Sequence, residues 1–297
     1  TDGTQKLRID LHDGKHIECV LIPHDNERLT LCVSSQAGCA LGCNFCATAT
    51  LGLLRNLTTN EILEQVYIAS DHLQPGYNSI TNLVFMGMGE PLANMQSVLS
   101  AIELLSDQQG MNFSMKRITV STVGLVPKIK ELGKRMNSVG LAISLHATTD
   151  ELRSRIMPVN RRYPIAELMS CLRNYPLPRR RVITFEYIVL DGLNHLADDV
   201  KRLAKLTKGI PCKINLLPYN PLRHDQPDLK RPSDDDVEDF AQALRDAGLH
   251  TTIRHSRGRD IAAACGQLAL KARANAITVS HQDTDLSRTR GARLKIP

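Results

Sequence analysis

The sequence contains no tryptophan, and aromatic residues make up only 4% of its 297 positions. A protein that stacks single-stranded bases on aromatic rings needs more of them, so this mode of nucleic-acid binding is not indicated. No apolar run approaches the length of a membrane span, and no secretory signal peptide is recognisable. Since the chain nevertheless has eight cysteines, we expect a cytoplasmic protein with reduced thiols and not a disulfide framework.

Positive charge is concentrated in two stretches of a chain whose formal net charge is +6. Residues 151–181 contain eight arginines against two glutamates, which alone gives +6, and residues 271–297 add six basic residues against two aspartates. A solvated surface would explain scattered charges equally well. An excess made of arginine also suits phosphate, because the planar guanidinium matches its oxygens. RNA or DNA is therefore a candidate partner.

The pattern of apolar residues predicts an α/β fold. Residues 7–11 and 17–22 are strand-like and flank Asp13-Gly14, which predicts a β-hairpin with a two-residue turn. Beyond it, strand-like segments alternate with helical ones, which predicts a parallel sheet in an open, partial (β/α)6 TIM-like barrel. The strands are expected at 30–34, 82–86, 117–121, 140–145, 182–190, 212–217 and 250–255, and the helices near 59–72, 94–107, 126–136, 164–174, 196–207 and 234–246.

Polar or turn-rich segments directly follow five of these predicted strands. They are the cysteine loop at 39–46, and then Gly87–Pro91, Ser121-Thr122, Ser144–His146 and Pro218–Pro221. In barrel enzymes the site is assembled at the carboxyl ends of the strands, so we expect these segments to share one rim. The acidic run after Ser233 is instead typical of a helix N-terminus, and not of a metal site.

Three cysteines in one short loop, Cys39, Cys43 and Cys46, have the spacing C-x3-C-x2-C. A [4Fe–4S] cluster has four irons, so three thiolates would leave one iron open to a small molecule. A structural zinc site normally has four protein ligands, and zinc would need a distant fourth ligand here. Three inert buried thiols are the remaining alternative.

With this loop, the chain resembles the radical S-adenosylmethionine (SAM) enzymes and, more closely, the RlmN/Cfr family of RNA adenine methyltransferases. The resemblance extends from about residue 2 to residue 270. It rests on LCVSSQ at 31–36, CALGCNFCATA at 39–49, MGMGEP at 86–91, STVGLVP at 121–127, SLHA at 144–147, CKINLLPYNP at 212–221 and RGRDIAAACGQL at 257–268.

The resemblance implies two cofactors and the residues that hold them. Cys39, Cys43 and Cys46 would ligate a [4Fe–4S] cluster, and SAM would chelate the open iron. Gly89 and Glu90 would meet the amino group of SAM, and further cofactor contacts would come from Ser121, Ser144, Leu145, His146 and Asn220.

The resemblance also implies three catalytic residues. Cys265 would receive a methyl group from one SAM, and a second SAM, cleaved reductively at the cluster, would activate that group for addition to C2 of adenine. Glu18 would then remove the ring proton as general base, with Cys19 as the alternative in the alignment. Cys32 would attack Cys265 and release methyladenine, leaving a disulfide. We assign Cys19, Cys171 and Cys212 to packing.

The expected organisation is a hairpin extension over 1–29, a radical SAM core over 30–270 and a basic, flexible tail over 271–297. Family members usually begin with a small helical RNA-binding domain, which this chain lacks ahead of Thr1. The expected partners are 23S rRNA, tRNA and an external reductant such as flavodoxin, for a monomer without membrane contact. Methylation of adenine C8 and a zinc-bearing RNA-binding module without chemistry are the alternatives.

Overall fold

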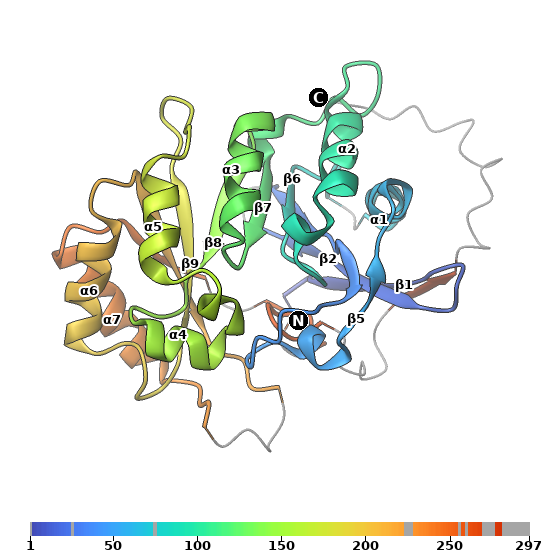
Figure 1. Ribbon diagram of the computed structural model, residues 1–297. Coiled ribbons are helices and arrows are strands. Elements are labelled where there is room, and N and C mark those ends of the chain that lie inside the picture. The colour runs from blue at the N-terminus through green and yellow to red at the C-terminus, as the bar shows by residue number, and fades with distance from the viewer. Residues whose placement is uncertain are drawn as a thin grey trace.

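The computed structural model describes residues 2–24, 27–73, 76–222, 228–254, 257–258, 261–268 and 277–280, the last by backbone alone. One ten-stranded sheet in the order β11-β10-β9-β8-β7-β6-β3-β2-β1-β12 runs through the molecule (Figure 1). Neighbouring strands from β3 to β11 pair in parallel. The predicted α/β fold is therefore confirmed, and the parallel strands form the open, partial barrel.

The parallel strands lie close to their predicted positions. They are β3 (Leu29–Cys32), β6 (Asn82–Phe85), β7 (Ile118–Thr122), β8 (Gly140–Ser144), β9 (Ile183–Val189), β10 (Cys212–Pro218) and β11 (Thr251–Ile253). The predicted helices form as α1 (Thr59–Asp71), α2 (Met95–Ser106), α3 (Val126–Arg135), α5 (Ile165–Arg173), α6 (Ala197–Thr207) and α7 (Asp234–Asp246).

Three short elements were not expected from the sequence. Helix α4 (Asp150–Ile156) follows β8, and β4 (Gln36–Gly38) pairs antiparallel with β5 (Leu53–Asn56) on either side of the cysteine loop. Elements this short give too few residues for a period to stand out. Four 3-10 turns also form, at Ala47–Leu51, Pro91–Asn94, Met115–Arg117 and Pro158–Arg161.

The hairpin of β1 (Gln5–Asp10) and β2 (His16–Pro23) adds two antiparallel strands beside β3. The predicted two-residue turn is wrong. The Leu11 N–H donates to the Lys15 carbonyl (2.7 Å) and the Gly14 N–H to the Leu11 carbonyl (3.0 Å), so residues 12–14 form the loop. Gly14 adopts φ +76°, the left-handed conformation that a three-residue hairpin loop needs at its last position.

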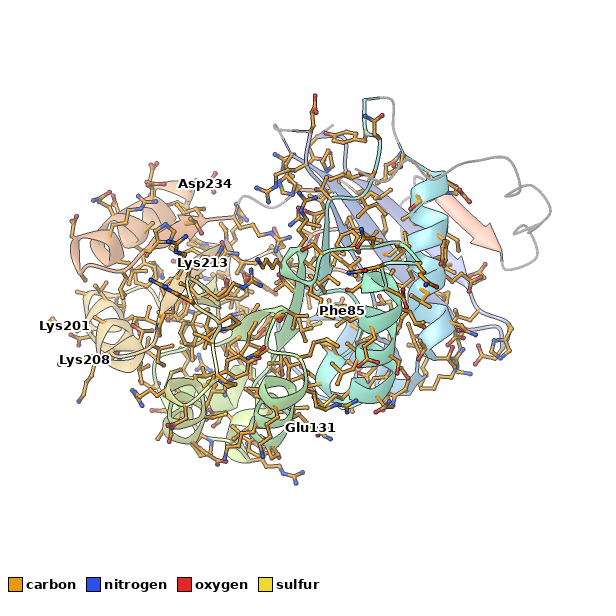
Figure 2. The ribbon with its side chains drawn as sticks, turned by 90° about the horizontal axis from the view of Figure 1, so that it is seen from above. Phe85, Glu131, Lys201, Lys208, Lys213 and Asp234 are labelled. Carbon is orange, nitrogen blue, oxygen red and sulfur yellow. The ribbon has the colours of Figure 1, made fainter. Side chains whose placement is uncertain are left out.

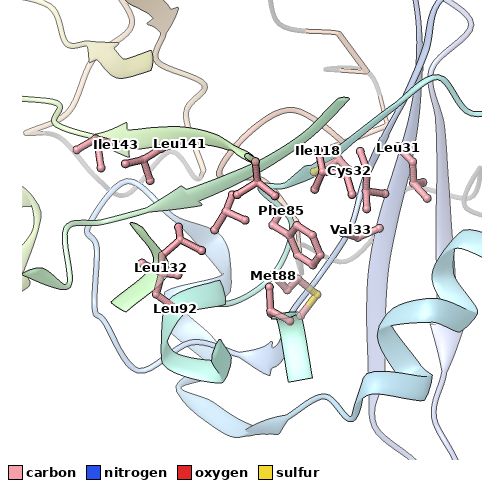
Figure 3. Close-up of a cluster of buried hydrophobic side chains, with 14 of the residues drawn as sticks. Leu31, Cys32, Val33, Phe85, Met88, Leu92, Ile118, Leu132, Leu141 and Ile143 are labelled. Atoms are coloured by element: carbon pink, nitrogen blue, oxygen red, sulfur yellow. The ribbon is translucent and has the colours of Figure 1, made fainter. Parts of the chain in front are cut away.

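The two faces of the parallel sheet differ in polarity. One face carries fully buried apolar side chains that pack with the helices, and Figure 3 shows Phe85 of β6, Ile118 of β7 and Leu141 of β8 with Leu132 of α3 in this cluster. By strand alternation the opposite, inner face carries Cys32, Val84, Thr119, Ser121, Ser144, Glu186 and Asn215. The inner face is thus available for chemistry.

Helix surfaces away from the sheet are charged, as the outward side chains of Lys201 in α6 and Asp234 in α7 illustrate (Figure 2). Within the described residues, no helix is long and apolar enough to cross a bilayer. The predicted tail, 271–297, contains one described strand, β12 (Ile277–Ser280), which pairs in parallel with β1, and otherwise lies outside the described residues.

Gly87 lets the loop after β6 approach the end of β3. Its N–H donates to the Val33 carbonyl (3.0 Å), and a Cβ at this position would lie 2.7 Å from that carbonyl group and 2.8 Å from the Ser34 nitrogen. Such distances do not occur between a Cβ and backbone atoms without a shift of one of them. Only glycine therefore fits between the two strand ends.

Gly87→Ala tests this close approach. Because the added methyl overlaps backbone, we expect the free energy of unfolding to fall by about 2–3 kcal/mol. Gly209→Ala is the matched control: at φ +79° its methyl would meet no atom within 4 Å, so only about 1 kcal/mol of backbone strain is expected. Thermal denaturation compares the two variants, and equal shifts in Tm would contradict the close approach.

Candidate functional site

The segments expected to share one rim do follow parallel strands of one sheet. The loop 87–91 follows β6, residue 123 follows β7, residues 145–147 follow β8 and Tyr219-Asn220 follows β10. The cysteine loop lies between β4 and β5, directly after β3. Because these strands are parallel, their carboxyl ends lie at the same edge of the sheet, where the site is expected.

The cysteine loop is held by backbone hydrogen bonds and by glycines in the left-handed region. Gly38 and Gly42 flank Cys39 with φ +78° and +65°. The Cys39 N–H donates to the Gly52 carbonyl (2.8 Å), and the Cys46 N–H donates to the Cys43 carbonyl (3.1 Å). The loop therefore presents its three thiols from one fixed turn.

The number of cysteines in the loop fits a four-iron cluster better than a zinc ion. Structural zinc normally takes four protein ligands, one more than this loop supplies. A four-iron cluster takes each cysteine on a different iron and leaves the fourth iron open. Elsewhere in the described part of the chain, Asp191, His195 and Asp236 bring three potential ligand atoms within 4.8 Å of one another.

The protein environment of Cys39 and Cys43 raises the pKa of both thiols. Burial raises the pKa of Cys39 to about 11, against the opposing hydrogen bond from Leu41. Burial also raises the pKa of Cys43, the charges of the other two cysteines add to this, and Arg153 opposes it. A bound metal centre would supply the positive charge that holds the three sulfurs as thiolates.

Glu90 joins the loop after β6 to the end of β7. The Leu92 N–H donates to its Oε1 (3.0 Å), the Val123 N–H donates to its Oε2 (2.9 Å), and its own N–H donates to Gln36 Oε1 (2.8 Å). Burial raises the pKa of the Glu90 carboxyl to about 7, although these backbone donors oppose the shift. Its carboxylate therefore anchors the loop that contains Gly89.

Gly89 is required where that loop crosses the cysteine segment. It adopts φ +95°, and a Cβ there would lie 2.5 Å from the Cβ of Gln36 and 2.8 Å from the Gln36 nitrogen. The backbone at Gly89 is thus pressed against the strand that enters the cysteine loop. This contact brings the predicted SAM residues and the predicted cluster residues together.

His146 lies just beyond β8 with φ +59°, in the left-handed region that is unusual for this residue type. Its Nδ1 accepts the Ile188 N–H (3.0 Å), which places the ring hydrogen on Nε2. Its ring packs edge-on against Phe45 of the cysteine loop, with ring centroids 4.8 Å apart. Burial and the charge of Arg153 lower the pKa of His146 to about 3, so the ring is neutral.

Arg153, on helix α4, holds the ends of β7 and β8 together. It is fully buried, and its guanidinium donates to the carbonyls of Leu145 (3.0 Å), Ser144 (3.0 Å) and Val123 (2.7 Å). A fourth hydrogen bond goes to Asn160 Oδ1 (2.9 Å). Burial lowers its pKa to about 10, with Cys43 among the opposing charges. The residue therefore orders the Ser144–His146 segment and places a cation near the cysteine loop.

Two further predicted cofactor residues lie at the same edge. Ser121 pairs with Ala142 on the inner face, one residue before the end of β7. Asn220 is buried two residues after β10, and Arg231 donates to its Oδ1 (3.5 Å). The structure thus places the predicted SAM residues on loops and strand ends from β6, β7, β8 and β10.

The segment with Cys265 lies against the cysteine loop. The Ala47 N–H donates to the Gly266 carbonyl (2.7 Å), and the Thr48 hydroxyl donates to the Leu268 carbonyl (3.1 Å). A Cβ on Gly266 would lie 2.9 Å from the Phe45 carbonyl oxygen. Cys265 is therefore fixed beside the loop of Cys39, Cys43 and Cys46, although it lies far from them in the sequence.

Strand register separates Glu18 from Cys19. Val20 pairs with Cys32, so Glu18 shares the inner face with Cys32, whereas Cys19 points to the opposite, apolar face. Burial, together with the charge of Cys265, raises the pKa of Cys32 to about 12, and Arg254 opposes the shift. The charge of Cys265 thus acts on the Cys32 thiol.

Sequence reasoning missed three residues that organise the site. Arg153 was counted with the arginines of a surface, yet it is buried, and its hydrogen bonds depend on two separate strand ends, those of β7 and β8. Gln36, also buried, binds both the Glu90 N–H and Asn56. Lys6, on β1, lies 3.2 Å from Glu18 Oε1. A lysine in an alternating strand pattern gives no sign of such burial.

Residues 33–207 match the sequence profile of the Radical SAM superfamily, and the chain belongs to it. It is 54% identical over 267 residues to the dual-specificity RNA methyltransferase RlmN of Syntrophobacter fumaroxidans, covering 90% of this chain and 77% of the relative. The RlmN of Geobacter sulfurreducens is 50% identical, with 90% and 72% covered. A radical SAM methyltransferase from Sphaerobacter thermophilus aligns with a TM-score of 0.85 and 46% identity, over 90% of this chain and 77% of that one.

Within the superfamily, the chain therefore belongs to the RlmN family. The cofactors of this family are a [4Fe–4S] cluster and SAM. The three-cysteine loop, with one ligand for each of three irons, fits the cluster. The loop 87–91, pressed against that loop and anchored by Glu90, adjoins it at the edge where a cofactor bound to the cluster would lie.

Cys43→Ala tests the cysteine loop as the cluster site. Iron and acid-labile sulfide should fall from about four each per chain to below about one, because one of three ligands is lost. Cys171→Ala, a buried free thiol on α5, is the control and should keep both values. Iron and sulfide analysis of anaerobically reconstituted protein gives the answer. One zinc per unsubstituted chain without sulfide would instead favour the zinc-bearing RNA-binding module.

Proposed function

We propose that this protein methylates C2 of adenine in 23S rRNA and tRNA, with the methyl group carried on Cys265. The observation that carries the proposal is the position of the Cys265 segment. It is fixed against the cysteine loop through Gly266 and Leu268, and electrostatic coupling relates Cys265 to Cys32 across the inner face. The similarity to relatives named dual-specificity RNA methyltransferase RlmN supports it.

Cys39, Cys43 and Cys46 would hold the cluster, with the open iron left for SAM. Bound together, cluster and SAM supply one-electron chemistry that can activate a carbon–hydrogen bond. Such chemistry is needed because adenine C2 lies between two ring nitrogens and is a poor nucleophile. The protein would contribute the three thiols that hold the cluster. It would also contribute two uncharged rings, those of Phe45 and His146, which pack against each other at the cysteine loop.

The hydrogen bonds of His146 and Glu90 support their proposed contacts with the cofactor. Because Nδ1 of His146 accepts from Ile188, its Nε2–H is the group that can donate. Gly89 and Glu90 are assigned to the amino group of SAM, with the Glu90 carboxylate also anchoring the loop through Leu92 and Val123. Ser121, Ser144, Leu145 and Asn220, from three strand ends, are assigned to the rest of the molecule.

Three residues on the inner side would act on the substrate. Cys265 would hold a methyl group on its sulfur and form the bond to the adenine ring through that carbon. Glu18, which shares the inner face with Cys32, would accept the ring proton. The Cys32 sulfur would then attack the Cys265 sulfur: the S–S bond forms, the bond from the Cys265 sulfur to the methylene carbon breaks, and that carbon takes up the proton lost by the Cys32 thiol, which gives methyladenine and a disulfide.

The arginine-rich stretch supports an RNA partner. Six of its arginines are exposed, whereas Arg153 is buried and Arg181 half-buried; the exposed ones are Arg155, Arg161, Arg162, Arg173, Arg179 and Arg180. Exposed guanidinium groups can contact several phosphates of a folded RNA. We further propose a monomer in the cytoplasm that receives electrons from a flavodoxin-type protein, since regeneration of the two thiols and supply of the radical chemistry both need a reductant.

Cys265→Ala should abolish methylation of 23S rRNA fragments and tRNA, because the carrier sulfur is gone. Iron content should stay unchanged, since Cys265 is not one of the three loop cysteines. Cys212→Ala, a half-buried thiol at the amino end of β10, is the control. Mass spectrometry should also find one added methyl on the peptide with Cys265 in the unsubstituted protein. Methylated RNA from Cys265→Ala would contradict the carrier role, and 8-methyladenine in the nucleoside product would contradict C2.

Cys32→Ala should trap the enzyme on its RNA. Without the attacking thiol, the bond from adenine through the methylene carbon to Cys265 persists, so a covalent protein–RNA species accumulates in a single turnover. Denaturing gel electrophoresis with labelled RNA detects it, and ribonuclease digestion confirms its nature. Free, methylated RNA in normal yield would contradict the resolving role of Cys32.

A further inference from the structure

The buried ion pair between Lys6 and Glu18 connects the hairpin to the segment with Cys265. Lys6 Nζ lies 3.2 Å from Glu18 Oε1, and the two side chains are 0% and 4% exposed. The same ammonium donates to the Ala262 carbonyl (3.3 Å), three residues before Cys265. One side chain thus contacts both the proposed base and the segment that presents the proposed methyl carrier.

We propose that Lys6 is a positioning residue for proton removal: it holds the Glu18 carboxylate at a fixed place relative to Cys265. The inference rests on the proposed function, and in particular on Glu18 as the base. The proton passes from the ring carbon to a Glu18 oxygen, while Lys6 keeps its own proton and its contacts throughout.

Strand register distinguishes Lys6 from the other cation of β1, Arg8. Arg8 is the residue directly opposite Glu18 in the β1–β2 pairing, whereas Lys6 lies opposite Val20, on the diagonal. The Arg8 guanidinium binds Asp10 (3.0 Å), and its side chain is 44% exposed. Lys6 is fully buried, and its ammonium lies against the carboxylate. Burial strengthens the attraction between two such charges, so of the two cations Lys6 is the one suited to hold Glu18 in place.

The contact with Ala262 adds a geometric role to the electrostatic one. Ala262 adopts φ +52°, a left-handed conformation that is costly for alanine, so surrounding contacts must hold it. Lys6 donates to its carbonyl, and nearby the Gly258 N–H donates to Asp2 Oδ2 (2.9 Å). Two hydrogen bonds from the N-terminal residues thus fix the segment that leads to Cys265. A shift of about 1 Å between base and reacting carbon would be enough to slow the reaction strongly.

A purely structural role of Lys6 and a positioning role lead to different expected effects when Lys6 is lost. If Lys6 only stabilised the hairpin, its loss would impair methylation of Cys265 and every later step alike. If Lys6 positions Glu18, its loss should spare methylation of Cys265 and slow the release of RNA, which is also the result expected for the loss of Glu18 itself. The two steps can be measured separately on one protein.

The experiment uses the anaerobically reconstituted 297-residue chain with an unmodified RNA hairpin in a single turnover. Mass spectrometry measures the methyl group on Cys265 before RNA is added, and denaturing gels follow the covalent protein–RNA species with time. The variants are Lys6→Met, Lys6→Arg, Glu18→Gln and the double variant Lys6→Met/Glu18→Gln. Arg8→Met is the matched control, because it removes a cation from the same face of the same strand whose guanidinium pairs with Asp10.

We expect Lys6→Met to methylate Cys265 within about threefold of the unsubstituted protein and to resolve the covalent species at least about tenfold more slowly. Lys6→Arg should restore resolution to within about threefold, because it keeps the charge and the donors. The double variant should be no slower than Glu18→Gln alone, since Lys6 acts through Glu18. Arg8→Met should resolve normally.

Normal resolution by Lys6→Met, or equal loss of both steps without rescue by Lys6→Arg, would overturn the inference while Glu18→Gln still stalls. If Glu18→Gln itself resolves the covalent species normally, Glu18 is not the base. That part of the proposed function is then wrong. Should Lys6→Met not yield iron-containing protein, Lys6→Gln, which keeps a donor for Ala262, replaces it with the same expected result and the same contradicting one.

Discussion

The position of the segment before and after Cys265 is the constraint on which the rest of the site depends. On one side Gly266 and Leu268 bind the cysteine loop through Ala47 and Thr48, and on the other side Lys6 binds Ala262. Each such hydrogen bond contributes only about 1 kcal/mol. Acting together on one short segment, they hold Cys265 between the cysteine loop and the hairpin, which both come from the opposite end of the chain. Neither partner alone would define where Cys265 lies.

The sheet can tolerate buried charged groups because its two faces differ in composition. Apolar side chains on the outer face, with Phe85 and Ile118 among them, supply the burial that stabilises the fold. The inner face and the strand ends can therefore carry charged groups whose burial is costly. Each of these has a specific partner: Lys6 pairs with Glu18, Arg153 with strand-end carbonyls, and Glu90 with backbone N–H groups. Polar groups in this protein are buried where chemistry is proposed.

Much of the fold could be predicted from the sequence because it depends on local patterns. Alternating apolar residues located β6 to β10, and Ser233 with three following aspartates located the start of α7. Motifs located the cysteine loop and the residues at strand ends. The hairpin turn was wrong, because Asp13-Gly14 is also compatible with the three-residue loop that formed. Lys6, Gln36 and Arg153 were missed, since their importance depends on register and on strand ends far apart in the sequence.

The hairpin forms one side of the site and does more than extend the barrel. The parallel strands reach only as far as β3, so their inner face would end at Cys32. By pairing antiparallel with β3, β2 continues the same face to Glu18, and β1 continues it to Lys6. The side-chain period of two means that a slip of one residue would turn both charges to the apolar face, where Cys19 now packs. The register of this hairpin therefore decides whether Glu18, the proposed base, lies on the inner face.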